Sequence, residues 1–381
     1  MVAETPIWRD RLTTEERAQL GRGAGTISLS RPDILVVGGG IAGVATAAAC
    51  HDAGLGSVLL IEAGRLGSGA TGGAAGLLTP EIHEWSDPEP FVELARTSLE
   101  LWGELEQKWP GGVGLIELDW IGLAPDPDGF APHQRPAVEW LDHDRVADLV
   151  PGLARPMAGA LIRRQARVNP LRSLTRLAAV LPAVATGIAA TSVTARGGRV
   201  TKVTTTAGDI HPGAVVFATG MAPAVPGLPE LGVPQRWVKG HLAATVPAPF
   251  RLRTALAALE GLVLQLPGGE IVAGGTLDEG DDDPVVRDGV VEHIRAALGS
   301  LLPRTAELPT GHAWCCFRPT TADEQPVIDR VPETENAWLT CGHFRTGILM
   351  AAGTGDALAR WIGTGAPPEG LEPFGLGRFA G

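Results

Sequence analysis

The stretch that decides the fold reads Asp33-Ile-Leu-Val-Val-Gly-Gly-Gly-Ile-Ala-Gly43, and the apolar run Ser57-Val-Leu-Leu-Ile-Glu62 follows it. Each apolar run has the length of one buried strand, and the small residues 41–53 between the runs predict a helix. Strands that are apolar throughout are typical of parallel sheets covered on both faces. This segment therefore predicts a β-α-β unit at the start of an α/β fold.

The glycines between the first strand and the helix match the pattern G-x-G-x-x-G. In this pattern Gly38 makes the tight turn, Gly40 lets a pyrophosphate approach the backbone, and Gly43 lets the helix pack closely on the strand. Glu62 ends the second strand, where an acidic side chain accepts a hydrogen bond from a ribose hydroxyl. These residues predict a dinucleotide site, and the glycine turn of an ordinary β-α-β unit is the plainer alternative.

Similar α/β segments recur in the middle and at the end of the chain. The apolar runs at 214–220 and 337–340 predict further strands, and residues 347–362 predict a helix. The stretches between them are strand-rich and punctuated by proline and glycine. We expect a discontinuous Rossmann-like dinucleotide-binding domain and an α+β domain with a mainly antiparallel sheet. The expected parts are an N-terminal extension (1–30), the dinucleotide-binding domain (31–80 with 155–225 and 318–381) and the second domain (81–154 with 226–317).

The composition excludes several classes of protein. The 381 residues include 31 Lys and Arg against 43 Asp and Glu, which gives a net charge of −12. An acidic chain without a basic stripe is a poor partner for nucleic acid or an anionic membrane. Its four cysteines lack zinc-site and C-x-x-C spacing, and no signal peptide or membrane-length apolar run is present. We therefore expect a cytoplasmic protein that binds no metal.

The residues after Glu62 distinguish between two dinucleotides. Residues 63–78 read Ala-Gly-Arg-Leu-Gly-Ser-Gly-Ala-Thr-Gly-Gly-Ala-Ala-Gly-Leu-Leu. Such small residues let the backbone pass close beneath a flat ring and offer N–H groups to phosphates. Because NAD dehydrogenases normally continue here with an ordinary helix, the stretch favours FAD. A flexible glycine loop is the alternative.

Four stretches together carry a likeness to a known family. They are the glycine motif, Ala70-Thr-Gly-Gly-Ala-Ala-Gly-Leu77, Phe217-Ala-Thr-Gly220 and a C-terminal block. The block reads Arg318-Pro-Thr-Thr-Ala-Asp-Glu-Gln-Pro-Val-Ile328 and then Cys341-Gly-His-Phe-Arg-Thr-Gly-Ile-Leu349. Over residues 31–365 the chain resembles the FAD-dependent D-amino acid oxidase and glycine oxidase family, and glycine oxidase most.

The resemblance implies which residues hold the cofactor. In order along FAD they are Val168 at adenine through its backbone, Glu62 and Ala63 at the ribose, Ile41 and Ala42 at the pyrophosphate, Ala70 and Thr71 near the phosphates, and Ala75, Gly76 and Leu77 beside the isoalloxazine. Thr219 and Gly220 belong to the strand-end motif. The flavin's pyrimidine end is expected to be wrapped by His343, Phe344, Arg345, Thr346, Gly347, Ile348 and Leu349. A helix N-terminus there would stabilise negative charge on the reduced ring.

The resemblance also implies two arginines that bind substrate. Arg318 and Arg345 match the family arginines that hold the substrate carboxylate, although an arginine taken alone is more often part of a surface ion pair. Two guanidinium groups can fix a carboxylate so that the α-carbon lies over flavin N5. Hydride transfer from a neutral amine then needs no protein nucleophile and no metal, so no catalytic side chain is expected. Water would hydrolyse the imine product, and O2 would reoxidise the flavin to give H2O2.

The absence of tyrosine sets this chain apart from the family pattern. Leu264 stands where glycine oxidase's tyrosine is expected, and we expect Leu277 to face the same pocket. An apolar pocket beside the amine suits an N-alkyl group, which makes N-substituted glycines candidate substrates. The alternative is that both leucines follow the ordinary alternation of a strand against its core.

Other features point to plain roles. Cys316 precedes Asp323 by seven residues, the spacing at which related sarcosine oxidases attach flavin covalently. A buried pair of small residues is the expected role for Cys315 and Cys316, with FAD bound non-covalently. The acidic run 278–283 lacks EF-hand spacing and is expected to be a solvated loop. The histidines without a partner pattern are His83, His133 and His312.

The expected function is oxidation of glycine or an N-substituted glycine by FAD, with O2 as the electron acceptor. The alternatives are a D-amino acid oxidase, a flavin dehydrogenase with a non-oxygen acceptor and, from another class, a flavin-binding scaffold without turnover. The expected partners are the small amino acid or N-alkylglycine and O2, without nucleic acid or membrane. Homo-oligomerisation is left open, and the sequence assigns no role to residues 1–30.

Overall fold

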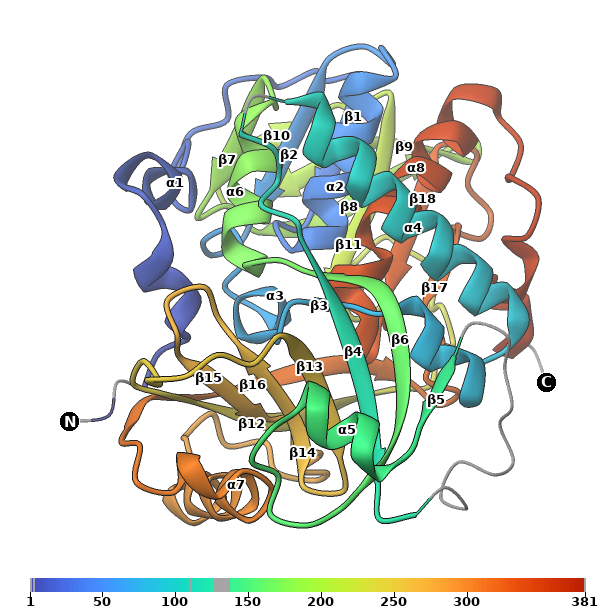
Figure 1. Ribbon diagram of the computed structural model, residues 1–381. Helices are drawn as coiled ribbons and strands as arrows, with labels where there is room; N and C mark the ends of the chain where they lie inside the picture. Colours follow the sequence, from blue (N-terminus) through green and yellow to red (C-terminus); the bar gives the residue numbers. More distant parts are fainter. Residues whose placement is uncertain (1, 3, 110, 127–137, 380–381) are drawn as a thin grey trace.

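The computed structural model describes residues 2, 4–109, 111–126 and 138–379, which two large sheets organise (Figure 1). Within these residues the first sheet has six strands, parallel to their neighbours except for the pair at one edge. In sheet order the strands are β17 (Val327–Arg330), β18 (Ala337–Cys341), β11 (Ala214–Gly220), β1 (Ile34–Val37), β2 (Val58–Glu62) and β7 (Ala183–Thr186). The expected β-α-β unit is confirmed, with α2 (Ile41–Asp52) between β1 and β2.

Helices cover one face of this sheet, and a strand meander covers the other. The helices are α2, α4 (Glu89–Lys108), α6 (Pro170–Ala179) and α8 (Gly347–Thr364). The meander consists of β8 (Ala190–Arg196), β9 (Arg199–Thr205) and β10 (Gly208–Ile210). Because both faces are covered, every position of β1 is buried, and this explains its unbroken apolar sequence.

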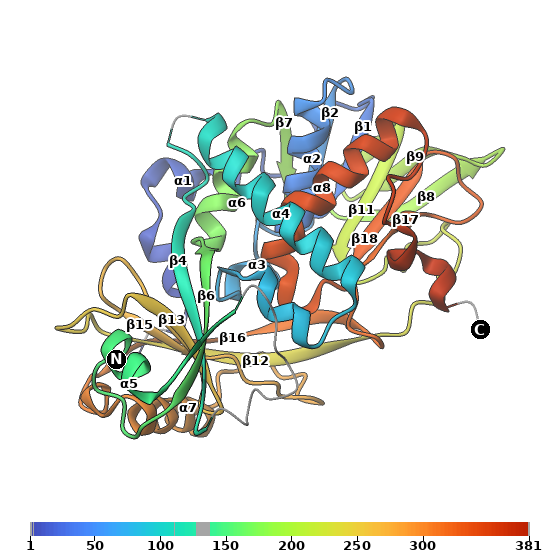
Figure 2. The ribbon, with the colours of Figure 1, turned by 45° about the vertical axis from the view of Figure 1, so that its right-hand side comes forward.

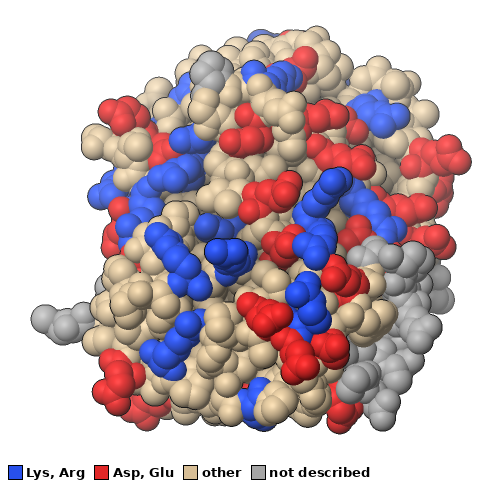
Figure 3. Space-filling model, in the orientation of Figure 1, with Lys and Arg blue, Asp and Glu red and all other residues tan. Residues whose placement is uncertain are grey.

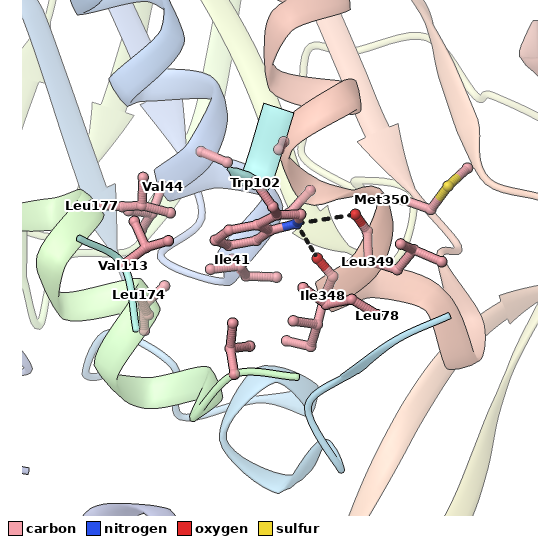
Figure 4. Close-up of a cluster of buried hydrophobic side chains, with 14 of the residues drawn as sticks. Ile41, Val44, Leu78, Trp102, Val113, Leu174, Leu177, Ile348, Leu349 and Met350 are labelled. Carbon is pink, nitrogen blue, oxygen red and sulfur yellow. Dashed lines mark hydrogen bonds between the residues drawn. The ribbon is translucent and has the colours of Figure 1, made fainter. Parts of the chain in front are cut away.

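Figure 4 shows the core between these helices, where Val44 of α2 and Leu174 of α6 pack near Trp102 of α4. The Trp102 side chain is fully buried and donates its indole N–H to the carbonyl oxygens of Ile348 and Leu349, at 3.1 Å each. A buried indole N–H needs an acceptor, and these two carbonyls belong to the first turn of α8. Trp102 therefore fixes the turn at which α8 begins.

The second sheet is mainly antiparallel and forms the lower half of the molecule in Figures 1 and 2. In sheet order its strands are β16 (Thr310–Thr321), β12 (Gln235–Thr245), β15 (Ile271–Gly274), β14 (Gly261–Gln265), β13 (Thr254–Ala258), β4 (Ile116–Ala124), β6 (Ala158–Arg167) and β3 (Leu77–Leu78), with β5 (Glu139–Leu141) paired to β6. Helices α5 (His143–Leu149) and α7 (Asp288–Leu301) pack on it away from the first sheet. The expected α/β fold with a Rossmann-like sheet and an antiparallel sheet is confirmed.

The expected domain boundaries do not follow the two sheets. β6 lies in the second sheet, although residues 155–225 are expected in the dinucleotide-binding domain. β16 runs through the expected boundary at 318, and β3 joins the second sheet from within 31–80. Sequence patterns reveal strands but not their partners, because pairing depends on residues far apart in the chain.

The N-terminal extension is packed against the rest of the molecule. It contains η1 (Ile7–Arg11) and α1 (Thr14–Gln19), and its buried side chains include Ile7 and Trp8. Arg22 donates to the carbonyl oxygens of Ala178 and Leu181 at the end of α6, at 3.0 and 2.9 Å. Residues 7–22 therefore belong to the folded body.

The surface carries both signs of charge. Figure 3 shows basic and acidic side chains interspersed over one face, and many of them are paired. Arg163, for example, lies 2.7 Å from Glu139 and 3.4 Å from Asp119. In the part of the chain that the structure describes, no helix is long and apolar enough to cross a bilayer.

Candidate functional site

Residues of both large sheets line a cavity of about 790 Å³. It opens at the carboxyl ends of the central parallel strands, where Val37, Glu62 and Ala218 lie on its wall. Open α/β sheets bind their ligands at this edge. The cavity's volume is within the ~300–1,000 Å³ typical of cofactor and ligand sites.

The glycine turn leaves room for a group held against the backbone. Gly38 has φ of +121°, and a side chain there would collide with the carbonyl oxygen of Ala218. A side chain at Gly43 would collide with the carbonyl of Gly38, so this glycine serves packing and is not part of the cavity wall. A Cβ at Gly40 would meet only Thr71 Oγ1, at 3.5 Å. The open space above Gly40 fits a pyrophosphate, as its position in the motif predicts.

Glu62 is held at the end of β2 by two backbone donors. Its Oε2 accepts from the N–H of Gly39 and its Oε1 from the N–H of Gly64, both at 2.7 Å. Each carboxylate oxygen can accept a further hydrogen bond, so the side chain remains available to a ribose hydroxyl. Glu62 and Ala63 both line the cavity, as expected.

Next to Glu62 the cavity wall is formed by residues 188–190 and not by Val168, the residue expected at adenine. Ile188, Ala189 and Ala190 line the cavity here, and the N–H of Ile188 donates to the carbonyl of Glu62 at 2.9 Å. The structure does not bring Val168 to the cavity wall. Its N–H donates instead to the carbonyl of Gly76 at 2.8 Å, so it supports the small-residue stretch 63–78 from behind.

The small-residue stretch 63–78 is a fixed structure and not a flexible glycine loop. Its Thr71 accepts from the N–H of Ile41 at 3.0 Å. The carbonyl of Gly73 accepts from the indole N–H of Trp314 at 3.0 Å, and the carbonyl of Ala74 from that of Trp8 at 2.8 Å. The expected residues of this stretch all line the cavity: Ala70, Thr71, Ala75, Gly76 and Leu77.

The start of α8 forms the other end of the cavity. Every expected residue from His343 to Leu349 lines it, together with Thr219, Gly220 and Thr340. His343 Nε2 lies 3.4 Å from Thr340 Oγ1 and 3.2 Å from Thr354 Oγ1. Complete burial lowers the pKa of His343 to about 4, which keeps its ring neutral. The N-terminus of an 18-residue helix adds positive potential at this end.

Both expected substrate arginines reach the cavity, but in different states. Arg318 of β16 is largely buried and donates from Nη1 to the carbonyl of Thr276 at 2.9 Å. No carboxylate among the described residues pairs with it, and burial lowers the pKa of its guanidinium, with a further contribution from the charge of Arg345. The Arg345 side chain is 49% exposed and lies 3.6 Å from Glu324. Arg318 is thus a partly buried cation without an ion-pair partner among the described residues.

The expected apolar residues lie elsewhere. Leu264 is 2% exposed in the core, Leu277 is 54% exposed in the loop after β15, and neither is on the cavity wall. Leu264 and Leu262 are two positions apart in β14, so they share one face of the strand, but only Leu262 lines the cavity. Leu277 lies three residues beyond the end of β15. The apolar side chains that do line the cavity include Ile82, Trp120, Trp237 and Leu262.

Cys316 also lines the cavity, where it lies directly against Gly73 of the small-residue stretch 63–78. A Cβ at Gly73 would collide with its side chain. Burial raises the pKa of the Cys316 thiol, which disfavours the nucleophilic thiolate. All four cysteines are free, and the described residues contain no His, Cys, Asp and Glu group suited to a metal ion.

The acidic run 278–283 is not simply solvated. Lys239 and His241 of β12 are fully buried, with Lys239 Nζ 2.9 Å from Asp281 and His241 Nδ1 2.7 Å from Asp278. The run thus satisfies two buried side chains. Its Asp278 also accepts a hydrogen bond from Thr276 Oγ1 at 2.8 Å, and the carbonyl of Thr276 accepts from Arg318. These pairs could not be predicted from local sequence patterns, because the partners lie about forty positions apart in the chain.

His83 has a partner that the sequence reading overlooked. Its Nδ1 lies 2.9 Å from Asp87 Oδ2, and its ring lines the cavity. Only four positions separate the two residues, so the pair could be predicted from the local sequence. His312 lies 3.7 Å from Asp10, and His133 is outside the described residues.

Comparisons with known proteins identify the family of the chain. Residues 33–361 match the DAO family, described as FAD dependent oxidoreductase. A glycine oxidase of Bacillus licheniformis is 31% identical, over 90% of this chain and 96% of that one. The solved glycine oxidase of Geobacillus kaustophilus has a TM-score of 0.79 at 27% identity, over 91% and 98% of the two chains. L-proline dehydrogenase of P. horikoshii shares the fold, with a TM-score of 0.83 at 19% identity over 92% and 98%. The family match spans most of the chain and both ends of the cavity, and the chain therefore belongs to the DAO family of FAD-dependent oxidoreductases.

Proposed function

We propose that the chain oxidises the amine of glycine or of an N-substituted glycine, and that O2 is its electron acceptor. The observation that carries this proposal is Arg318, a partly buried guanidinium on the cavity wall that forms no ion pair with a carboxylate among the described residues. A substrate carboxylate would supply the missing charge through a charge-assisted pair. Curated relatives named glycine oxidase support the same substrate class.

The chain's own residues would bind and orient the cofactor and the substrate. The turn at 38–43, Glu62 and the stretch 75–77 would hold FAD, which supplies the hydride acceptor when bound. Thr276 fixes the direction of the Arg318 guanidinium through the 2.9 Å hydrogen bond from Nη1. Arg345 adds a second cation at the more exposed side of the cavity. A carboxylate held by both would have its α-carbon in one orientation, which lowers the entropy cost of the hydride step.

The apolar wall favours a substituent on the amine. Trp120, Trp237 and Leu262 line the cavity, and the chain has no tyrosine with which to place a hydroxyl there. A 4-methylaminobutanoate oxidase of Paenarthrobacter nicotinovorans, 26% identical over 91% of this chain and 45% of that one, acts on an N-methylated amine by its name. N-alkylglycines therefore rank beside glycine as candidate substrates, and a small D-amino acid is the alternative.

The electron acceptor is tested by following reoxidation of the flavin. The enzyme is reduced anaerobically with an N-alkylglycine and then mixed with air-saturated buffer in a stopped-flow instrument. Fast return of the oxidised spectrum with one H2O2 per flavin is the expected result. Slow return in air but fast return with a quinone would contradict the oxidase and support the dehydrogenase alternative. Cytoplasmic location and homo-oligomerisation stay predictions.

A further inference from the structure

The proposed reaction requires a proton to leave the substrate before the hydride does. Amino groups with ordinary pKa values of about 8–10 are mostly ammonium at neutral pH. An ammonium nitrogen has no free electron pair with which to form the C=N bond as hydride leaves. A group in the cavity that takes this proton would therefore accelerate flavin reduction.

Six titratable side chains line the cavity within the described residues, and five are unsuited to this task. Arg318 and Arg345 are cations, and Glu62 lies at the ribose end, bound by two backbone donors. Burial raises the pKa of the Cys316 thiol and lowers that of His343 to about 4, and His343 is enclosed by threonines. His83 is the remaining one.

His83 is oriented as a base by a fixed carboxylate. Its Nδ1 lies 2.9 Å from Asp87 Oδ2. Asp87 also accepts from Ser86 Oγ at 2.8 Å and from Gln325 Nε2 at 3.0 Å. Burial acts to raise the pKa of the Asp87 carboxyl, but its hydrogen bonds outweigh burial and lower that pKa to about 2. An ionised Asp87 only accepts, so Nδ1 carries the proton and Nε2 is the basic nitrogen.

The second ring nitrogen remains free for a substrate. No described residue forms a hydrogen bond to Nε2, while the His83 ring lines the cavity and packs on Phe91 with centroids 5.1 Å apart. This is the arrangement in which a carboxylate holds an imidazole in one tautomer and stabilises the imidazolium that forms.

The pair lies on the same side of the site as Arg345. Asp87, Phe91 and Arg345 line one second cavity of about 540 Å³, so the His83–Asp87 pair and Arg345 share the partition between the two cavities. The hydrogen bond from Gln325 ties Asp87 to the turn whose Glu324 faces Arg345.

The other carboxylates around His83 have arginine partners. Glu81 and Glu84 of η2 (Pro80–Trp85) both pair with Arg96 of α4. On the facing turn, Asp323 pairs with Arg378, and Glu324 with Arg345. Asp87 is therefore the carboxylate in hydrogen-bond contact with the His83 ring.

We infer that His83 and Asp87 form the acid–base pair of this site, in which His83 Nε2 removes the proton from the substrate's ammonium group. The N–H bond breaks, the proton goes to Nε2, and the electron pair stays on the substrate nitrogen. That pair then forms the C=N bond as hydride leaves the α-carbon for FAD, and the imidazolium later returns its proton to water. This inference rests on the proposed function.

The test is the anaerobic rate of flavin reduction at saturating substrate from pH 6 to pH 10 in the wild type and in His83→Gln. At pH 7 we expect the variant to be slower by about 10²-fold. Its rate should rise with the free-amine fraction, approach the wild type near pH 10, and recover in part when imidazole is added. His211→Gln, which changes an exposed histidine of the meander, is the matched control and should leave the profile unchanged.

Two further measurements keep the result interpretable. An unchanged flavin spectrum and unchanged binding of acetate, a carboxylate without an amine, would show that His83→Gln is folded and that the arginine site is intact. Wild-type rates in this folded variant at pH 7 would overturn the inference while leaving the proposed function standing. Failure of every amine to reduce the wild-type flavin at any pH would overturn the proposed function, and the inference with it.

Discussion

At the scale of single residues, Arg318 and Arg345 have different energetic roles despite their shared motif block. Arg318 is partly buried and has no ion-pair partner among the described residues, whereas Arg345 is half-exposed and already faces Glu324. Exposed ion pairs contribute little, about 0–1 kcal/mol, because water screens them. The buried cation should therefore contribute most of the carboxylate binding.

This difference predicts unequal effects of alanine substitutions. Arg318→Ala should weaken substrate binding by about 3 kcal/mol, roughly 10²-fold, because it removes a charge-assisted pair. Arg345→Ala should have a smaller effect, and Glu324→Gln should tighten binding slightly by freeing Arg345. Substrate dissociation constants from anaerobic titration measure all three. An Arg345→Ala loss larger than that of Arg318→Ala would contradict this ranking.

The residues also show what sequence reading can reach. Gly38, Gly40 and Glu62 were predictable because the turn, the close approach and the strand end are local features. Val168 and Leu264 were misplaced, since the wall that a residue faces depends on how distant strands pair and bend. The His83–Asp87 pair is local, yet histidine and aspartate four apart are too common for the pattern alone to assign a role.

At the scale of elements, residues 7–20 of the N-terminal segment form a clamp that is hydrogen-bonded to the small-residue stretch 63–78. Trp8 donates to the carbonyl of Ala74 at 2.8 Å and packs edge-on against Trp314, which holds the carbonyl of Gly73. The N–H of Leu66 donates to the carbonyl of Leu20 at 3.0 Å. The segment precedes the family match at 33–361, so no motif could have assigned this role.

The clamp predicts that a change at Trp8 weakens cofactor binding. Trp8→Phe keeps an aromatic ring but removes the N–H that orients Ala74, and should raise the FAD dissociation constant by about 5–10-fold. Trp361→Phe is the matched control, because the Trp361 indole nitrogen is buried without a partner in the described structure. Fluorescence titration of apoprotein with FAD measures both. Equal FAD affinities in the wild type and Trp8→Phe would show that FAD binding does not depend on the hydrogen bond from Trp8 to Ala74.

The second sheet shows where element-level prediction ends. Strand positions follow from alternation and punctuation, but β6 and β16 reach across the expected domain boundaries. The acidic loop was expected to be solvated because its composition is polar. Its role depends on Lys239 and His241, which are buried in β12 and need its carboxylates.

At the scale of the whole molecule, the buried His343 makes stability depend on pH. Burial lowers its pKa from 6.5 to about 4 in the folded state. Between these values the unfolded chain binds a proton that the folded chain does not, so the free energy of unfolding falls as pH decreases from 6.5 to 4. The full loss is about 3 kcal/mol.

Denaturant unfolding of the FAD-saturated protein at several pH values tests this effect. The wild type should lose stability across this window, and His343→Gln should lose much less because its side chain does not titrate. Asp87 acts in a separate window, since its pKa is lowered to about 2, and its contribution is lost only as pH falls from 3.8 through 2. Parallel pH profiles for the wild type and His343→Gln would contradict the assignment.

The central claim for the whole molecule is that one cavity holds FAD and positions an amino acid's carboxylate on Arg318. Its most direct test is anaerobic bleaching of the flavin at about 450 nm, where oxidised flavins absorb. The panel is glycine, sarcosine, longer N-alkylglycines, D-alanine and D-proline, each with the wild type and Arg318→Ala. We predict that glycine and N-alkylglycines bleach the wild-type flavin and that Arg318→Ala needs far more substrate. Two results would contradict the account: no member of the panel bleaches the wild-type flavin, or Arg318→Ala is bleached at the same substrate concentrations as the wild type.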